Sequence, residues 1–433
     1  MNFASVSQEE FQANWKPRFF TIFGGQALSL FGSSLVQFAL VWYLTQQTGS
    51  ATILATATLV AMLPQVILGP FVGTLVDRWN RRAVMIVADA FIALATLVLA
   101  GLFLFDVVQL WHIYAILLVR SLGGAFHWPA MQASTSLMVP KEQLARVAGM
   151  NQTLQGLVAI VAPPTGAVLI SLLPTQGVLM IDVVTALLAV VPLLFIAIPQ
   201  PVREQARDGR QETSYWQDLR EGFRYVAAWP GLLAIMLLAV LINFLLTPAM
   251  SLMPLLVTKH FGLGAIEFGL TDSLFGIGMI LGGVLLGIWG GFKKRIVTSM
   301  TGIIGLGTGI VLTGLAPANM FWLALTGMAI GGFMSPITNG PLFALLQSTV
   351  KPEMQGRVMS LISSAAIAMT PLSLAVAGPV SDLIGIRTWY IFGGIFCILM
   401  GAGAFFVPAL MNIEQNHEQS TVQTSDASIA VAD

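Results

Sequence analysis

The hydrophobic positions of this chain fall into long, nearly unbroken runs that short polar segments separate. Most runs reach the roughly 20 residues that a helix needs to cross a bilayer. They do not alternate apolar and polar positions over ~10 residues, as barrel strands do. The pattern therefore predicts twelve membrane-spanning helices, at about residues 18–45, 51–76, 83–105, 110–138, 144–172, 176–198, 231–258, 266–290, 295–316, 320–349, 355–382 and 386–410.

The longest polar stretch lies in the middle of the chain and separates six spans from six. Its second part, SYWQDLREGFRYVAAW, has apolar residues at helical spacing, which fits a helix on the membrane surface and an ordinary loop equally well. We expect five parts in order: a cytoplasmic N-terminus (1–17), an N-terminal six-helix bundle (18–198), a cytoplasmic linker (199–230), a C-terminal six-helix bundle (231–410) and a cytoplasmic tail (411–433).

The two groups of spans repeat each other. GGAFHWP in the fourth span corresponds to GGFMSP in the tenth, and PKEQLARV after the fourth corresponds to PEMQGRV after the tenth. GPFVGTLVDRWNRR and GGVLLGIWGGFKKR form a third pair, offset by nearly the same interval. Three pairs in register indicate an internal repeat. The predicted fold is an all-α membrane protein with twelve transmembrane helices, in two six-helix bundles related by pseudo-twofold symmetry.

Composition supports this interpretation and excludes several classes of protein. Charged residues make up 9% of the 433 positions and hydrophobic residues 56%, whereas a soluble domain carries roughly 25% charge. The net charge of zero argues against a nucleic-acid partner, and the single cysteine, Cys397, excludes an internal disulfide. The N-terminal segment carries Glu9 and Glu10 and does not resemble a signal peptide.

The basic residues predict the orientation of the chain. Except for Arg120, Lys259 and Arg387, every Lys and Arg lies in, or within the first residues after, the N-terminal segment or an even-numbered connection. Because Lys and Arg concentrate in cytoplasmic loops, both termini are expected in the cytoplasm.

The connection between the second and third spans carries GTLVDRWNRR. Gly73 permits close helix approach, Asp77 can face a helix N-terminus, and Arg78, Arg81 and Arg82 can pair with carboxylates. We interpret these residues as a conformational latch, with plain positive-inside charge as the alternative. The pattern G-x-x-x-D-R-x-x-R-R at this place resembles the loop signature of the major facilitator superfamily.

Further motifs narrow the resemblance. R-S-L-G-G-A, starting at Arg120, resembles the fourth-span signature of drug/proton antiporters. FTIFGGQALSL, VWYLTQQTGSA, GAFHWPA and IGGFMSP, in this order, resemble the bacterial macrolide-efflux branch of the superfamily. The resemblance implies a multi-pass protein of the bacterial cytoplasmic (inner) membrane that exports hydrophobic drugs by proton antiport and alternating access. It also implies a central cavity lined by spans one, four, seven and ten.

Polar side chains recur at helical spacing in those four spans. Facing a mostly apolar cavity, such residues would be its few polar binding points; the alternative is that they bond back to their own helix or join helices. Two aromatic residues, Phe38 and Phe275, are expected to form part of the apolar wall of the cavity. The substrate-binding candidates are Gln26, Ser33, Gln37, Phe38, Arg120, His127, Asn243, Thr247, Phe275, Ser335 and Asn339.

Proton coupling requires a titratable group inside the membrane. The candidates are Asp272 first, because its span borders the cavity in the superfamily, and then Asp89 and Asp182, whose spans are peripheral there. His127 is an alternative proton carrier. Many antiporters of the superfamily carry an acid in the first span, and this chain has none there.

We expect no enzyme activity and no metal or other cofactor, because the four histidines are scattered and there is no Walker motif. The proton gradient is the expected energy source. The expected partners are a hydrophobic small molecule, protons and lipid, with the chain as a monomer. The alternatives are export of a native metabolite or siderophore, import, and a transport-inactive sensor or assembly partner on the same fold.

Overall fold

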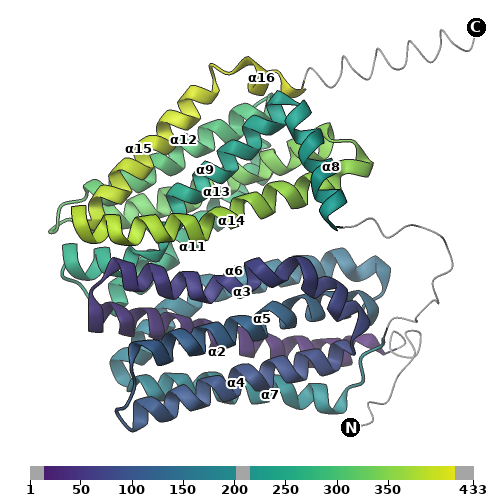
Figure 1. Ribbon diagram of the computed structural model, residues 1–433, viewed down its shortest axis with the longest axis vertical. Coiled ribbons are helices and arrows are strands. Elements are labelled where there is room, and N and C mark those ends of the chain that lie inside the picture. The colour runs from purple at the N-terminus through teal and green to yellow at the C-terminus, as the bar shows by residue number, and fades with distance from the viewer. Residues whose placement is uncertain (1–13, 201–214, 415–433) are drawn as a thin grey trace, which may run out of the picture. The chain divides into compact units, whose positions relative to one another are not determined.

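The computed structural model describes residues 14–200 and 215–414. The expected polar segments at 1–13, 201–214 and 415–433 lie outside these ranges. Within them every regular element is helical (Figure 1). The long helices are α2 (Trp15–Thr48), α3 (Ala51–Arg78), α4 (Arg81–Leu104), α5 (Leu110–Met138), α6 (Leu144–Leu172), α7 (Thr175–Phe195), α9 (Pro230–Ser251), α11 (Ala265–Trp289), α12 (Arg295–Leu315), α13 (Phe321–Thr349), α14 (Pro352–Ile384) and α15 (Ile386–Ala404).

These helices confirm the predicted membrane fold. In the described ranges, 11 helices are long and apolar enough to cross a bilayer. The other long helix, α5, has 29 residues and is long enough to span. It is more polar because Arg120 and His127 lie within it. Twelve spans are consistent with this set.

The seventh span ends earlier than expected. We predicted a helix to residue 258, but α9 ends at Ser251 and is followed by a short turn of helix, α10 (Met253–Leu255), and a π-helical turn, η2 (Leu256–His260). Pro254 has no N–H to donate to the preceding turn, so it interrupts the α-helical hydrogen bonds. The apolar run continues through this break, which is why hydropathy alone places the boundary too late.

Short polar connections set the helix ends. Gly49 follows α2 with φ of 57°, a left-handed conformation that glycine adopts without strain. Ser50 then caps α3 by accepting a hydrogen bond from the backbone N–H of Ile53 at 3.3 Å, and Asn80 caps α4 through the N–H of Ala83 at 3.0 Å. Side chains of this type satisfy amides that have no partner in the first helical turn.

The chain divides into two compact units. The N-terminal unit comprises Met1–Gly209 and Met253–Ser273, and the C-terminal unit comprises Arg210–Leu252 and Leu274–Asp433. In the N-terminal unit α2 packs on α6 and α7, and α4 packs on α5 and α7. In the C-terminal unit α9 packs on α14 and α15, and α12 packs on α13 and α15. The same neighbour relations therefore recur in both units, as expected of an internal repeat.

The second part of the linker forms a helix, α8 (Tyr215–Ala228), which packs on α14. Val226 is fully buried in the core of the C-terminal unit, and Glu221 pairs with Arg357 at 2.5 Å. Phe223 is exposed. The segment is thus a helix docked on its own unit rather than an ordinary loop, with an apolar side chain left on its outer face.

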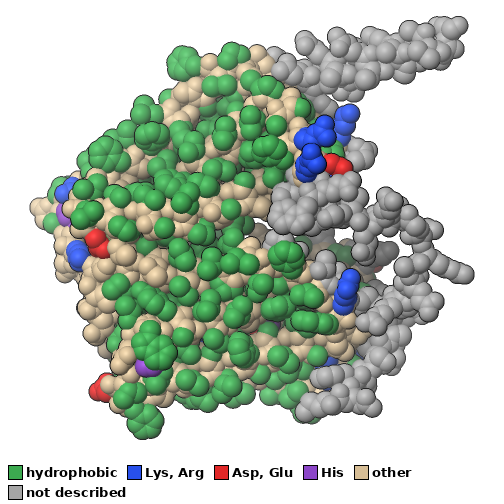
Figure 2. Space-filling view, viewed as in Figure 1, with side chains coloured by type: hydrophobic (Ala, Val, Ile, Leu, Met, Phe, Trp, Pro, Cys, Tyr) green, Lys and Arg blue, Asp and Glu red, His purple; other side chains and the backbone are tan. Residues whose placement is uncertain are grey.

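Apolar side chains also cover the outside of the long helices. Leu188, Val284 and Phe396 are each at least half exposed, which would be costly in water and is expected where helices face lipid. On the face drawn in Figure 2, green side chains follow the helices and the charged ones lie near helix ends. The scarcity of charge in the sequence thus matches an apolar surface suited to a bilayer.

Candidate functional site

A buried ion pair lies inside the N-terminal unit. The Asp182 side chain, on α7, is fully buried, and its Oδ2 lies 2.5 Å from Nη1 of Arg120 on α5, whose side chain is 11% exposed. Thr96 on α4 accepts a hydrogen bond from Arg120 and donates one to Asp182 at 3.0 Å. Ser33 on α2 donates to the other carboxylate oxygen at 3.0 Å. Four helices thus converge on one carboxylate, whose charge is compensated by a cation and by hydroxyl donors.

A second buried carboxylate, Asp89 on α4, has different surroundings. The Gln26 amide donates to Oδ2 at 3.0 Å, and Nε2 of His127 lies 3.3 Å from Oδ1 without hydrogen-bond geometry. No arginine or lysine is paired with Asp89 in the described residues. The balance of charge here therefore depends on whether the His127 ring carries a proton.

Both sets of residues meet a cavity of about 700 Å³ in the N-terminal unit. Asp89 lines it directly, whereas Asp182 is not among the lining residues. The cavity thus contains acid, base and amide groups on a largely apolar wall. The predicted residues that line it are Gln26, Ser33, Gln37, Asp89, Arg120 and His127.

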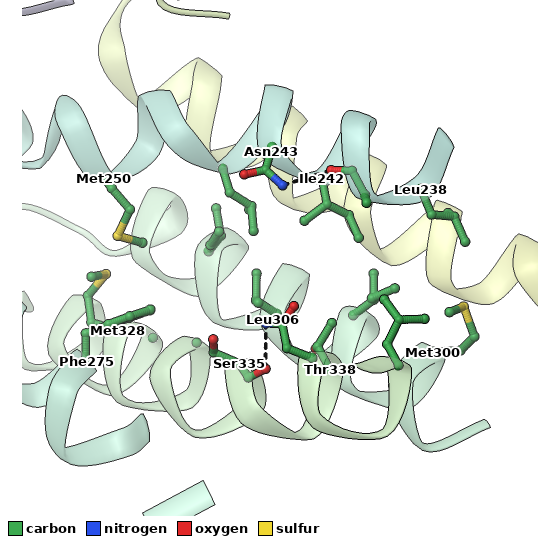
Figure 3. A pocket seen from close by; sticks show the side chains of 18 of the residues that line it. Leu238, Ile242, Asn243, Met250, Phe275, Met300, Leu306, Met328, Ser335 and Thr338 are labelled. Carbon is green, nitrogen blue, oxygen red and sulfur yellow. Dashed lines mark hydrogen bonds between the residues drawn. The ribbon is translucent and has the colours of Figure 1, made fainter. Parts of the chain in front are cut away.

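The C-terminal unit has its own cavity, of about 250 Å³ (Figure 3). It lies among α9, α11, α12 and α13, and its described lining residues include no charged side chain. Most of the wall is Leu, Ile and Met, with a few polar side chains. The predicted residues that line it are Asn243, Phe275, Ser335 and Asn339.

Three other predicted residues lie apart from both cavities. The Phe38 ring is buried and stacked on Phe268, with centroids 4.9 Å apart, so it does not wall either cavity. Thr247 is half-buried and does not line the cavity beside Asn243. Asp272, on α11, is half-buried, and no hydrogen bond or ion pair joins it to the described residues.

The predicted latch residues contact the ends of neighbouring helices in their own unit. Nη1 of Arg81 donates to the Ala133 carbonyl of α5 at 2.7 Å. Arg82 donates to the carbonyls of Leu193 and Leu194, near the end of α7, at 2.5 and 2.8 Å. These bonds suit a guanidinium, which favours the negative end of a helix dipole.

The other three predicted latch residues are Gly73, Asp77 and Arg78. Gly73 has open space around it, so no close helix contact requires a glycine there. Arg78 is exposed and has partners of its own, and the side chain of Asp77 lies outside the described residues.

Sequence reasoning missed Thr96, which connects Arg120 to Asp182. A signal was available, because Thr96 lies seven residues after Asp89 and therefore on nearly the same face of α4. It also missed the pairing of Arg120 with Asp182, since the two lie 62 residues apart and no local pattern connects them.

Comparisons with known proteins place the chain in a family. The model of the Major Facilitator Superfamily matches residues 22–366. Macrolide efflux protein A of Streptococcus pyogenes is 36% identical over 388 residues, which cover 89% of this chain and 95% of that protein. The multidrug efflux pump Tap of Mycolicibacterium fortuitum is 27% identical over 394 residues, covering 88% and 94%.

A crystal structure of a bacterial homologue of the human lysosomal transporter Spinster shares the fold, with a TM-score of 0.68 at 13% identity. The match covers 93% of this chain and 98% of that one. The fold, the internal repeat and the family match agree with one another. The chain belongs to the major facilitator superfamily and is a multi-pass membrane transporter, not an enzyme.

Proposed function

We propose that this protein exports hydrophobic, macrolide-like compounds across the bacterial cytoplasmic membrane in exchange for protons. Its similarity to proteins named as macrolide and multidrug efflux proteins supports the substrate class. The observation that carries the proton coupling is a buried carboxylate, Asp89, that lines a cavity beside His127.

In this proposal Asp89 carries the proton and Asp182 does not. Asp182 has a permanent cation, Arg120, at 2.5 Å, so its negative charge is stabilised in place. Asp89 has a neutral amide and a histidine as neighbours, and it lines a cavity. A carboxylate beside a fixed cation is held in its charged form, so the carboxylate without one is the better candidate for exchanging a proton.

The proton state of Asp89 then controls the conformational cycle. A charged carboxylate is costly to bury without compensation, so the deprotonated state favours a hydrated, open cavity. Protonation removes that charge and permits the cavity to close. A proton taken up from outside therefore favours the return of the empty transporter to the inward-open state. The proton is released into the cytoplasm before the next drug molecule binds.

Both termini lie in the cytoplasm, and the chain acts as a monomer. The proton gradient supplies the energy, so no cofactor is needed.

Asp272 takes a lower rank in this scheme than in the sequence analysis. It has no hydrogen-bonding or ionic partner in the described residues, whereas Asp89 has His127 within 3.3 Å. A base nearby gives a released proton somewhere to go.

The test uses everted membrane vesicles whose lumen is acidified by respiration and monitored with acridine orange. Adding erythromycin should release protons from the lumen and restore the dye's fluorescence with the wild type, and Asp89→Asn should abolish this response. The matched control is Asp106→Asn, because Asp106 is an exposed acid in a loop between α4 and α5. No response of the wild type to a broad panel of lipophilic drugs would contradict the proposal.

A further inference from the structure

Two asparagines in the cavity of the C-terminal unit donate hydrogen bonds to their own helices and leave their side-chain oxygens without a donor among the described residues. The side-chain NH2 of Asn243 donates to the Ala239 carbonyl at 2.9 Å, and that of Asn339 donates to the Ser335 carbonyl at 3.0 Å. Each amide thus points its nitrogen back at its own helix. Because an amide carries its oxygen opposite its nitrogen, each oxygen is left for another partner.

The Thr338 hydroxyl in this cavity also donates to a carbonyl of its own helix. Thr338 donates to the Met334 carbonyl at 2.9 Å, which leaves only acceptor lone pairs on its oxygen. In the part of the chain that the structure describes, no donor reaches the side-chain oxygen of either asparagine. The side-chain oxygens of Asn243 and Asn339 therefore remain free to accept a hydrogen bond from a ligand.

The rest of the wall is apolar and adaptable. Met250, Met300 and Met328 come from α9, α12 and α13, and Figure 3 places their side chains around the same space as Asn243 and Leu306. Methionine is flexible and polarizable, so it fits ligands of different shape. With no charged residue among the described lining, neither a cation nor an anion finds a counter-charge here.

We propose that this cavity binds an uncharged, hydroxyl-bearing segment of the exported molecule, and that Asn243 and Asn339 select for ligands that donate hydrogen bonds. The inference rests on the proposed export function and specifies its substrate class. It places a binding wall on α12, a helix that the sequence analysis did not expect to contribute. A volume of about 250 Å³ suits one sugar-sized or similar apolar segment, not a whole macrolide.

The experiment crosses a protein change with a ligand change. Binding of erythromycin and of its fully O-methylated derivative is measured by isothermal titration on the purified chain in nanodiscs, without a proton gradient. The wild type should bind erythromycin more tightly than the ether, because methylation removes the donors but keeps the apolar body. Asn243→Leu should weaken erythromycin binding about fivefold, the value of one ordinary hydrogen bond, and leave the ether unchanged. Asn339→Leu should act in the same way.

Asn151→Leu is the control, because Asn151 lines the cavity of the N-terminal unit. This variant should keep the wild-type preference for erythromycin over the ether. Equal wild-type affinity for both ligands, or equal loss of both in Asn243→Leu, would overturn the inference. The result is separable from the export proposal, since drug-induced proton release in vesicles can persist when the donor selectivity is absent. Failure of proton release with donor-selective binding intact would instead overturn only the antiport proposal.

Discussion

The buried ion pair between Arg120 and Asp182 permits a quantitative prediction about stability. Arg120→Leu removes the only cation paired with a carboxylate that is 0% exposed, in the part of the chain that the structure describes. Hydrogen bonds from Ser33 and Thr96 at 3.0 Å remain, but they do not cancel a full charge. Breaking one partner of a buried pair typically costs about 3–5 kcal/mol. We expect a loss of this size in the free energy of unfolding.

The double variant Arg120→Leu with Asp182→Leu should recover part of that loss. Replacing a buried pair by apolar residues of similar volume is often neutral or stabilising. Ser33 then loses its acceptor, whereas Thr96 can still donate to the Ile92 carbonyl at 3.0 Å. One unsatisfied hydroxyl costs about 1–3 kcal/mol, so the double variant should end about 1–3 kcal/mol below the wild type.

The assay is equilibrium unfolding in mixed micelles of SDS and a mild detergent, followed by tryptophan fluorescence. The prediction requires a coupling between the two sites, with the double variant more stable than Arg120→Leu. A loss below about 1 kcal/mol in Arg120→Leu, the range of an exposed pair, would refute the reasoning. So would additive losses in the double variant.

Two further predictions concern packing and surface charge. Gly309→Ala should lower the free energy of unfolding by about 1–3 kcal/mol, since the added Cβ would lie 2.5 Å from the Gly327 carbonyl oxygen. The control in the same SDS titration is Gly403→Ala, whose added Cβ meets open space and should cost nothing. Equal losses in the two variants would contradict this close packing. Glu221→Gln should change the free energy of unfolding by less than about 1 kcal/mol, because the Glu221 side chain is 41% exposed in the pair with Arg357. A larger loss that becomes smaller at high salt would show instead that α8 is held mainly by this pair.

The fold could be predicted from the sequence because the bilayer imposes a simple rule on it. Continuous apolar runs give the spans, and the termini of most helices agree with the expected ranges within a few residues. Two helices end six or seven residues before the expected position, α15 at Ala404 and α9 at Ser251. For α9 the cause is local, since Pro254 interrupts the helix without interrupting its hydrophobicity. Hydropathy reports burial in lipid and does not detect a missing backbone donor.

The candidate site could be predicted only in part. Gln26 and Ser33, which were selected by their helical spacing, line a cavity, but their partners, Asp89 and Asp182, lie on other helices. The choice of neighbouring helices depends on packing across the whole unit. The periodicity of a single helix carries no information about these neighbours. Phe38 illustrates the same limit. It lies beside a polar stripe of α2, yet its ring stacks on Phe268 of α11 and does not line the cavity.

The central claim, that Asp89 couples proton movement to export, is tested most directly in proteoliposomes with an imposed pH gradient and radiolabelled erythromycin. The wild type should accumulate the drug against its concentration gradient and also catalyse drug exchange at equilibrium. Asp89→Asn should retain exchange, because the neutral amide resembles the protonated carboxylate and permits the conformational change. It should lose gradient-driven accumulation, because the amide does not take up and release a proton. Accumulation by Asp89→Asn at the wild-type level would contradict the account.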